Sequence, residues 1–81
     1  MKKYKKVYMD YYGYCPDDVI MSEMGGGVAV EIHHIIFKSQ GGKDVIENLI
    51  ALTREQHDRA HFKKKPYIYA AELQEIHNRN L

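Results

Sequence analysis

Four of the five histidines in this chain fall between positions 33 and 61, in a pattern that suits metal binding. His57 and His61 are four residues apart, so on a helix they share one face about one turn apart. Two imidazoles in that arrangement are a ready pair of ligands for a divalent ion. Such a pair alone is weak evidence, but His33 and His34 close a predicted strand upstream of the loop that leads to this helix. The sequence therefore predicts a metal site between strand and helix.

Paired helical histidines also occur in zinc proteases, in the motif H-E-x-x-H. Here the shorter Asp58 stands where that motif has its general-base glutamate, and 81 residues are too few to surround the motif with a peptide cleft. The protease interpretation is therefore disfavoured.

The rest of the sequence predicts the elements that would position these histidines. Aromatic and apolar residues repeat at helical spacing from Tyr4 to Tyr11, and Gly13 follows as a helix stop. We expect irregular chain over 14–27, a strand over 28–32, a loop carrying Gly41-Gly42 and a second apolar strand over Leu49–Leu52.

A capping box predicts where the histidine-bearing helix begins. Thr53 and Gln56 have the S/T-x-x-E/Q spacing in which two side chains cap the first turn reciprocally. That helix should run to about Phe62. Pro66 suits the first position of a final helix, whose apolar stripe would be Tyr69, Leu73 and Ile76.

Length and composition narrow the class of protein. Eighty-one residues allow one domain with a thin core, and such domains usually need a disulfide or a metal. Cys15 is the only cysteine, which excludes an internal disulfide and points to a reducing compartment or to indifference about redox state. At 44% hydrophobic and 28% charged the chain is ordinary and globular, with no apolar run for a signal peptide or a membrane span. We expect a cytoplasmic protein.

Two lysine clusters stand out from a net charge of only +1. One crowds the first six residues, and the other is Lys63-Lys64-Lys65. Both could hold phosphate backbones, which need positive charge but no particular spacing. Taken alone, such clusters are more often solvated helix ends.

Residues 28–61 resemble the HNH endonucleases, which are ββα-metal, or His-Me finger, nucleases. The resemblance is carried by Glu31-Ile32-His33-His34-Ile35, Gly41-Gly42, Asp44, Asn48-Leu49-Ile50-Ala51-Leu52, His57 and His61. Residue types and spacings agree together, so the motif is specific. More loosely, the chain is similar to short HNH proteins of phages and prophages, which would place it in the cytoplasm of a bacterial host.

The resemblance implies a role for each matching residue. His34 would be the general base that activates water, and Asn48 would fix the loop that presents it. His33 and His57 would be metal ligands, and His61 an additional ligand found in some members. Because successive strand residues point to opposite sides, His33 and His34 could flank a scissile phosphate. The products would carry 3′-hydroxyl and 5′-phosphate ends.

The chain departs from many close relatives in one respect. Those relatives hold a structural zinc on two C-x-x-C pairs, which would fall near Ser22 and Gly25 and at Thr53 and Gln56. None of these four residues is a cysteine here, so a structural zinc is implausible. The capping box occupies the second pair of positions.

Two further residues are expected to take no part in the chemistry. Asp44 should cap or brace the glycine loop, and His77, outside the motif, should be solvated. Six cations are candidates for DNA contact: Lys38, Arg54, Arg59, Lys63, Lys64 and Lys65.

Together these features predict an α+β fold over residues 1–81, with a ββα-metal core at 28–62 and one helix packed on each end. The predicted function is a DNA endonuclease with one divalent ion (Mg, Mn, Zn, Ni or Co), acting as a monomer or homodimer. The alternative is a non-catalytic DNA-binding or phage-packaging accessory module that retains the metal to stabilise its fold.

Overall fold

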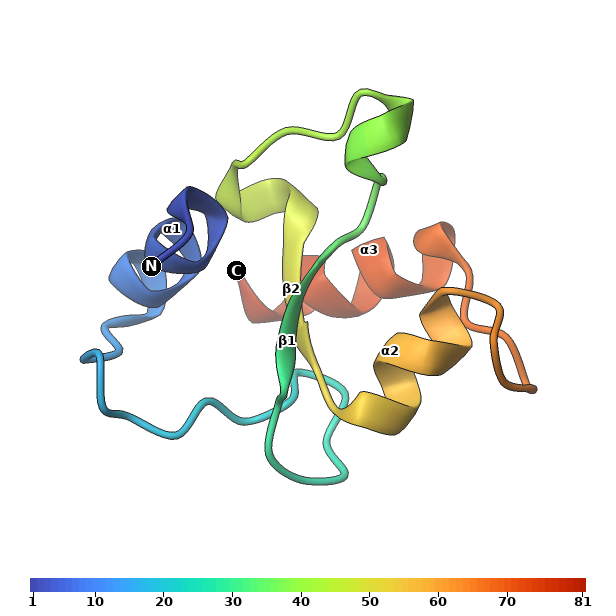
Figure 1. Ribbon diagram of the computed structural model, residues 1–81, viewed down its shortest axis with the longest axis horizontal. Coiled ribbons are helices and arrows are strands. Elements are labelled where there is room, and N and C mark those ends of the chain that lie inside the picture. Colours follow the sequence, from blue (N-terminus) through green and yellow to red (C-terminus); the bar gives the residue numbers. More distant parts are fainter.

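The computed structural model describes residues 1–81 and shows three α-helices and a two-stranded sheet (Figure 1). The elements are α1 Lys3–Tyr12, β1 Glu31–His34, β2 Leu49–Leu52, α2 Arg54–Ala60 and α3 Ala70–Asn80. Two short 3₁₀ turns, Lys38–Gln40 and Ile46–Asn48, lie between the strands. The predicted order and the α+β class are confirmed. None of the helices combines the length and apolar character that a membrane crossing requires.

The core has two halves, one on each face of the sheet. β1 and β2 are antiparallel, with Glu31 opposite Leu52 and His34 opposite Leu49, and all of β2 is buried. Because side chains alternate along a strand, its Leu-Ile-Ala-Leu run supplies both halves. One half is Tyr8, Met9, Ile20, Ile32, Leu49 and Ala51, and the other is Ile35, Ile50, Leu52, Ala60, Ile68 and Leu73. In Figure 1 the strands accordingly run between α1 and the α2–α3 pair.

Element boundaries differ from the prediction in two places. The first strand begins at Glu31 rather than at residue 28, because Val28 forms a bridge with Met21 instead. The final helix begins at Ala70, not Pro66, and α2 ends at Ala60, two residues early. The backbone carbonyl of Pro66 instead accepts a hydrogen bond from Arg59 Nε at 2.6 Å, outside any helix.

Helix α1 follows the predicted pattern only in part. It ends at Gly13, whose left-handed backbone (φ 76°) closes the last turn with a hydrogen bond to Met9 O. Tyr8 is buried, at 2% exposed, whereas Tyr11 at the end of the predicted stripe is 52% exposed.

The predicted capping box at the start of α2 is confirmed. Thr53 Oγ1 accepts from the Gln56 N–H at 3.2 Å, and Gln56 Oε1 accepts from the Thr53 N–H at 2.9 Å. The same Gln56 side chain also accepts from the Ser22 hydroxyl, and its Nε2 donates to the Gly25 carbonyl at 2.8 Å. These four residues lie at or near the positions where the resemblance places the cysteines of zinc-binding relatives.

The expectation that His77 is solvated is wrong. His77 is 0% exposed, with Nδ1 2.8 Å from Glu23 Oε1 and Nε2 bonded to the Ile46 carbonyl. Glu23 also accepts from the Tyr8 hydroxyl at 2.7 Å and from Asn80 Nδ2 at 3.1 Å. Burial alone would lower the pKa of His77, but the bonds to Glu23 and to the backbone raise it above its ordinary value. An acceptor on each nitrogen favours the protonated ring, which links α3 to the inter-strand loop and, through Glu23, to Tyr8 of α1.

Candidate active site

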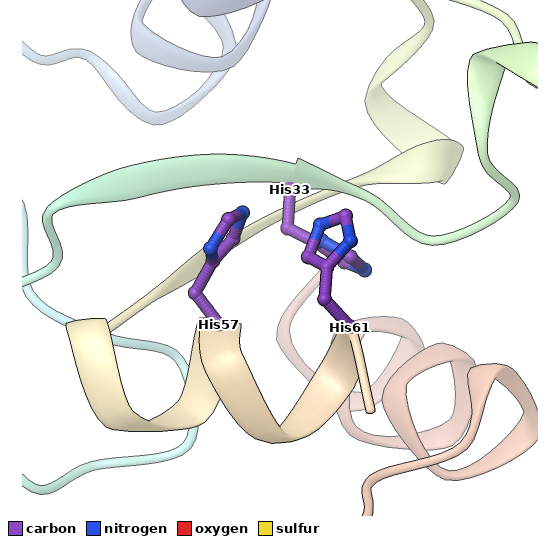
Figure 2. Close-up of side chains that lie close together, drawn as sticks. All are labelled: His33, His57 and His61. Carbon is purple, nitrogen blue, oxygen red and sulfur yellow. The ribbon is translucent and has the colours of Figure 1, made fainter. Parts of the chain in front are cut away.

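The structure brings the three predicted ligands His33, His57 and His61 together (Figure 2). His33 comes from β1 and His57 from α2, and His61 directly follows α2 as its C-cap. Each offers one ring nitrogen, and these three atoms lie within 4.8 Å of one another. The figure shows the two helical rings turned towards the strand, one turn apart.

The protonation of this cluster suits a metal ligand set. His33 is 3% exposed, and its Nε2 is buried without a hydrogen-bond partner. Burial, followed by repulsion from His61 and His57, lowers the pKa of His33 to about 3. Burial, followed by repulsion from His61, also lowers the pKa of His57. Two of the three imidazoles are thus held neutral, with free lone pairs, which is the state that binds a metal.

His34 lies away from the cluster and is held by an acid. Its Nε2 is 2.7 Å from Asp44 Oδ1, and its ring packs edge-on against Tyr4 with 4.7 Å between ring centroids. The hydrogen bond to His34, with Lys38 Nζ at 3.3 Å, lowers the pKa of Asp44. An ionised carboxylate only accepts hydrogen bonds, so Nε2 of His34 carries a proton and Nδ1 keeps its lone pair when the ring is neutral.

Asp44, expected to cap or brace the glycine loop, also holds the His34 ring. The Gly41-Gly42 pair explains how it reaches His34. A Cβ on Gly42 would lie 1.8 Å from the Ile36 carbonyl oxygen, so only glycine lets the loop pass this close to the end of β1. The glycine pair predicted a tight loop here, but it did not indicate which side chain of the loop would contact His34.

Asn48 joins the two ends of the same loop. Its Oδ1 accepts from the Ile36 N–H at 2.7 Å, while its Nδ2 donates to the carbonyls of Ile36 and Lys43, each at 3.1 Å. Asn48 is 7% exposed, so these bonds are shielded from water. They fix the backbone just after His34 and just before Asp44.

His33 and His34 open into one cleft of about 520 Å³. Its other lining residues include Tyr4, Phe37, Lys38, Ser39, His57 and His61. Phe37, which the sequence did not single out, lies parallel to the His61 ring at 5.0 Å. The histidine cluster and His34, which is hydrogen-bonded to Asp44, therefore line the same cleft.

The six candidate DNA-contact cations have different environments. Lys38 lines the cleft and contacts Asp44, whereas Arg59 Nε is engaged by the Pro66 carbonyl. Lys64 lies 3.6 Å from Glu55. The remaining three, Arg54, Lys63 and Lys65, are exposed and form no ion pair.

An antiparallel strand pair followed by a helix, with histidines on strand and helix facing each other, is compatible with a ββα-metal nuclease core. Residues 13–63, more than half of the chain, match the family model described as HNH endonuclease. The chain belongs to the HNH endonuclease family. No curated protein and no solved structure matches it.

Proposed function

We propose that this protein is a metal-dependent DNA endonuclease that hydrolyses phosphodiester bonds with His34 as general base. The observation that supports this most is the shared cleft, in which the histidine cluster and His34 face the same space, with Asp44 holding the His34 ring. A site that only stabilised the fold would need ligands, but it would not need a fourth histidine held beside them by a carboxylate.

His33, His57 and His61 would hold one divalent ion. The unpartnered, buried Nε2 of His33 fits that role, because a buried polar atom without a partner is costly. When bound, the ion supplies positive charge that neutralises the phosphate and stabilises the departing alkoxide. Three imidazoles without a carboxylate favour Zn²⁺, Ni²⁺ or Co²⁺ by affinity.

His34 would take a proton from the attacking water. Asp44 fixes the ring and its tautomer, so that Nδ1 offers the lone pair, and it stabilises the imidazolium that forms. Asn48 holds the loop backbone on both sides of this pair. Lys38, 3.3 Å from Asp44 and on the cleft wall, is placed to attract the phosphate. Release of the 3′ oxygen would leave 3′-hydroxyl and 5′-phosphate ends.

Cleavage of supercoiled plasmid, with and without a chelator, tests the proposal. The wild type should nick or linearise the plasmid with added Mn²⁺, Mg²⁺ or Ni²⁺, and chelator should stop it. His34→Ala should reduce the rate by about 10²–10⁴-fold. It should bind metal as the wild type does, because His34 is outside the ligand cluster.

Glu72→Ala, at an exposed α3 position without a side-chain hydrogen bond, is the matched control and should cleave normally. A His34→Ala protein that cleaves within threefold of the wild type would refute the assignment of the base. A wild type that binds DNA and metal but never cleaves would favour the accessory-module alternative.

A further inference from the structure

The chain leaves helix α2 through a phenylalanine, two residues past Ala60, in a backbone conformation that glycine usually occupies. Phe62 has a φ of 62° and is the only non-glycine residue with a positive φ. Its N–H bonds to the Arg59 carbonyl and the Lys63 N–H to the Asp58 carbonyl, which is a Schellman helix end. Glycine would sit there without strain. Burial does not offset the strain, because Phe62 is 47% exposed.

Two tyrosines extend this exposed ring into an aromatic patch. The Phe62 ring centroid lies 5.4 Å from that of Tyr67 and 5.7 Å from that of Tyr69. Tyr69 is 59% exposed and Tyr67 partly exposed. We call Phe62, Tyr67 and Tyr69 the aromatic patch. All three residues are at least partly exposed, whereas Tyr8 is buried in the core.

The patch is surrounded by positive charge. Lys63, Lys64 and Lys65 form the exposed segment between its first two rings, and Lys65 Nζ lies 5.9 Å from the centre of the Tyr67 ring. Arg59 holds this segment in place through the Pro66 carbonyl. Aromatic faces among cations suit a ligand with both a flat apolar ring and a negative charge.

The patch also adjoins the candidate active site. A cavity of about 210 Å³ is lined by Phe62 and Tyr69 on one side and by His33 and Phe37 on another. His33 and Phe37 line the active-site cleft as well. A cavity of this volume would hold several water molecules, at roughly 30 Å³ each, and so has room for a flat ring. A strand in the cleft could therefore place a neighbouring base here.

We propose that the aromatic patch stacks an unpaired base of the DNA substrate, so that the enzyme acts on DNA with a single-stranded gap, flap or bulge beside the cleavage site. This rests on the proposed function, since DNA must be the ligand. Paired bases cannot supply the interaction, because their faces are covered by their neighbours in the duplex. Stacking on aromatic side chains with lysines on the backbone is how proteins bind single strands.

The test is a binding measurement that does not need cleavage. Fluorescence anisotropy with chelator present compares a labelled duplex with the same duplex carrying a three-nucleotide gap. Stacking of one base should make the gapped DNA bind about tenfold more tightly at equal salt. The same gap with abasic sites should lose that advantage, because flexibility and charge remain while the base is gone.

Two variants remove rings without weakening the fold. Phe62→Gly places glycine at its preferred position, and Tyr69→Ser places a better N-cap at the start of α3, so both should melt at or above the wild-type temperature. Each should bring the affinity for gapped DNA close to that for duplex and leave duplex affinity within twofold. The control is Tyr11→Ser, which removes an exposed ring from α1 and should keep the preference.

Equal wild-type affinity for gapped DNA and duplex would overturn the inference, as would a preference that survives in both variants or on abasic DNA. A variant that loses affinity equally for both DNAs would also overturn it, because the aromatic patch cannot stack on the paired bases of the duplex. These outcomes are separate from the proposed catalysis. A protein that cleaves plasmid through His34 but binds both DNAs alike loses only this inference, whereas one with the stacking preference but no nuclease activity loses only the proposed function.

Discussion

Replacing Gln56 with alanine should destabilise the protein more than any other single polar change near the helix start. The Gln56 side chain makes three hydrogen bonds, with the Thr53 N–H, the Ser22 hydroxyl and the Gly25 carbonyl. At about 1 kcal/mol each, their loss lowers the free energy of unfolding by about 3 kcal/mol. A chain of this length has roughly 4–12 kcal/mol in total, so the change is a large fraction.

Urea unfolding followed by far-UV circular dichroism measures this directly, because ΔG falls linearly with urea. Gln56→Ala should shift the midpoint strongly at an unchanged slope. Thr53→Ala, which removes the single bond from the cap hydroxyl, should cost about 1 kcal/mol. Gln40→Ala makes the same substitution at an exposed position without a side-chain hydrogen bond, and it should stay within about 0.5 kcal/mol of the wild type.

The test is whether Gln56→Ala lowers the free energy of unfolding more than Thr53→Ala does. If Gln56→Ala costs no more than Thr53→Ala, then the bonds to Ser22 and Gly25 contribute nothing, and Gln56 acts as an ordinary helix cap. If Gln40→Ala costs as much as Gln56→Ala, the loss reflects the residue type and not the network.

Four further outcomes are expected. Asp44→Asn should slow cleavage by about 10–100-fold while calorimetry shows unchanged metal affinity, because it removes the charge that orients His34. Elemental analysis should find at most one divalent ion per chain, lost in His33→Ala; two tightly held zincs would contradict the interpretation of the cysteine-free positions. Replacing Lys63, Lys64 and Lys65 with glutamine should flatten the salt dependence of DNA binding, by about 0.9 in log–log slope for each phosphate that the lysines no longer neutralise. The raised pKa of His77 means that its pairing with Glu23 stabilises the fold fully below about pH 6.5 and less as pH rises through the folded pKa, so urea titrations should show Glu23→Gln costing more at pH 6 than at pH 9.

The sequence could predict those features that short-range patterns determine. The capping box depends on two residues three positions apart, and the pairing of His57 with His61 depends on helical spacing, so both could be recognised without the fold. The placement of His33 against them was expected from the family resemblance, which implies that the strand and helix histidines hold one ion.

What could not be predicted depends on contacts between distant segments. His77 is a polar residue on a mostly exposed helix. Nothing in its local sequence indicates that Glu23, 54 positions away, accepts a hydrogen bond from it. Asp44 reaches His34 only because of how the glycine loop folds back. The strain at Phe62 is likewise a property of where α2 stops, two residues before the sequence suggested.

The hydrogen bonds around Gln56 bear on what the metal does in this protein. In the zinc-binding relatives that the chain resembles, a second ion fixes the start of the metal-binding helix. Here the Gln56 side chain, one residue before His57, accepts hydrogen bonds from the Ser22 hydroxyl and the Thr53 N–H and donates one to the Gly25 carbonyl, at or near the same positions. The start of α2 is therefore fixed by bonds that need no ion, and the helix can present its histidines before metal arrives. Under the proposed function, a metal ion at the histidine cluster would therefore serve the reaction and would not be needed to fix the start of that helix.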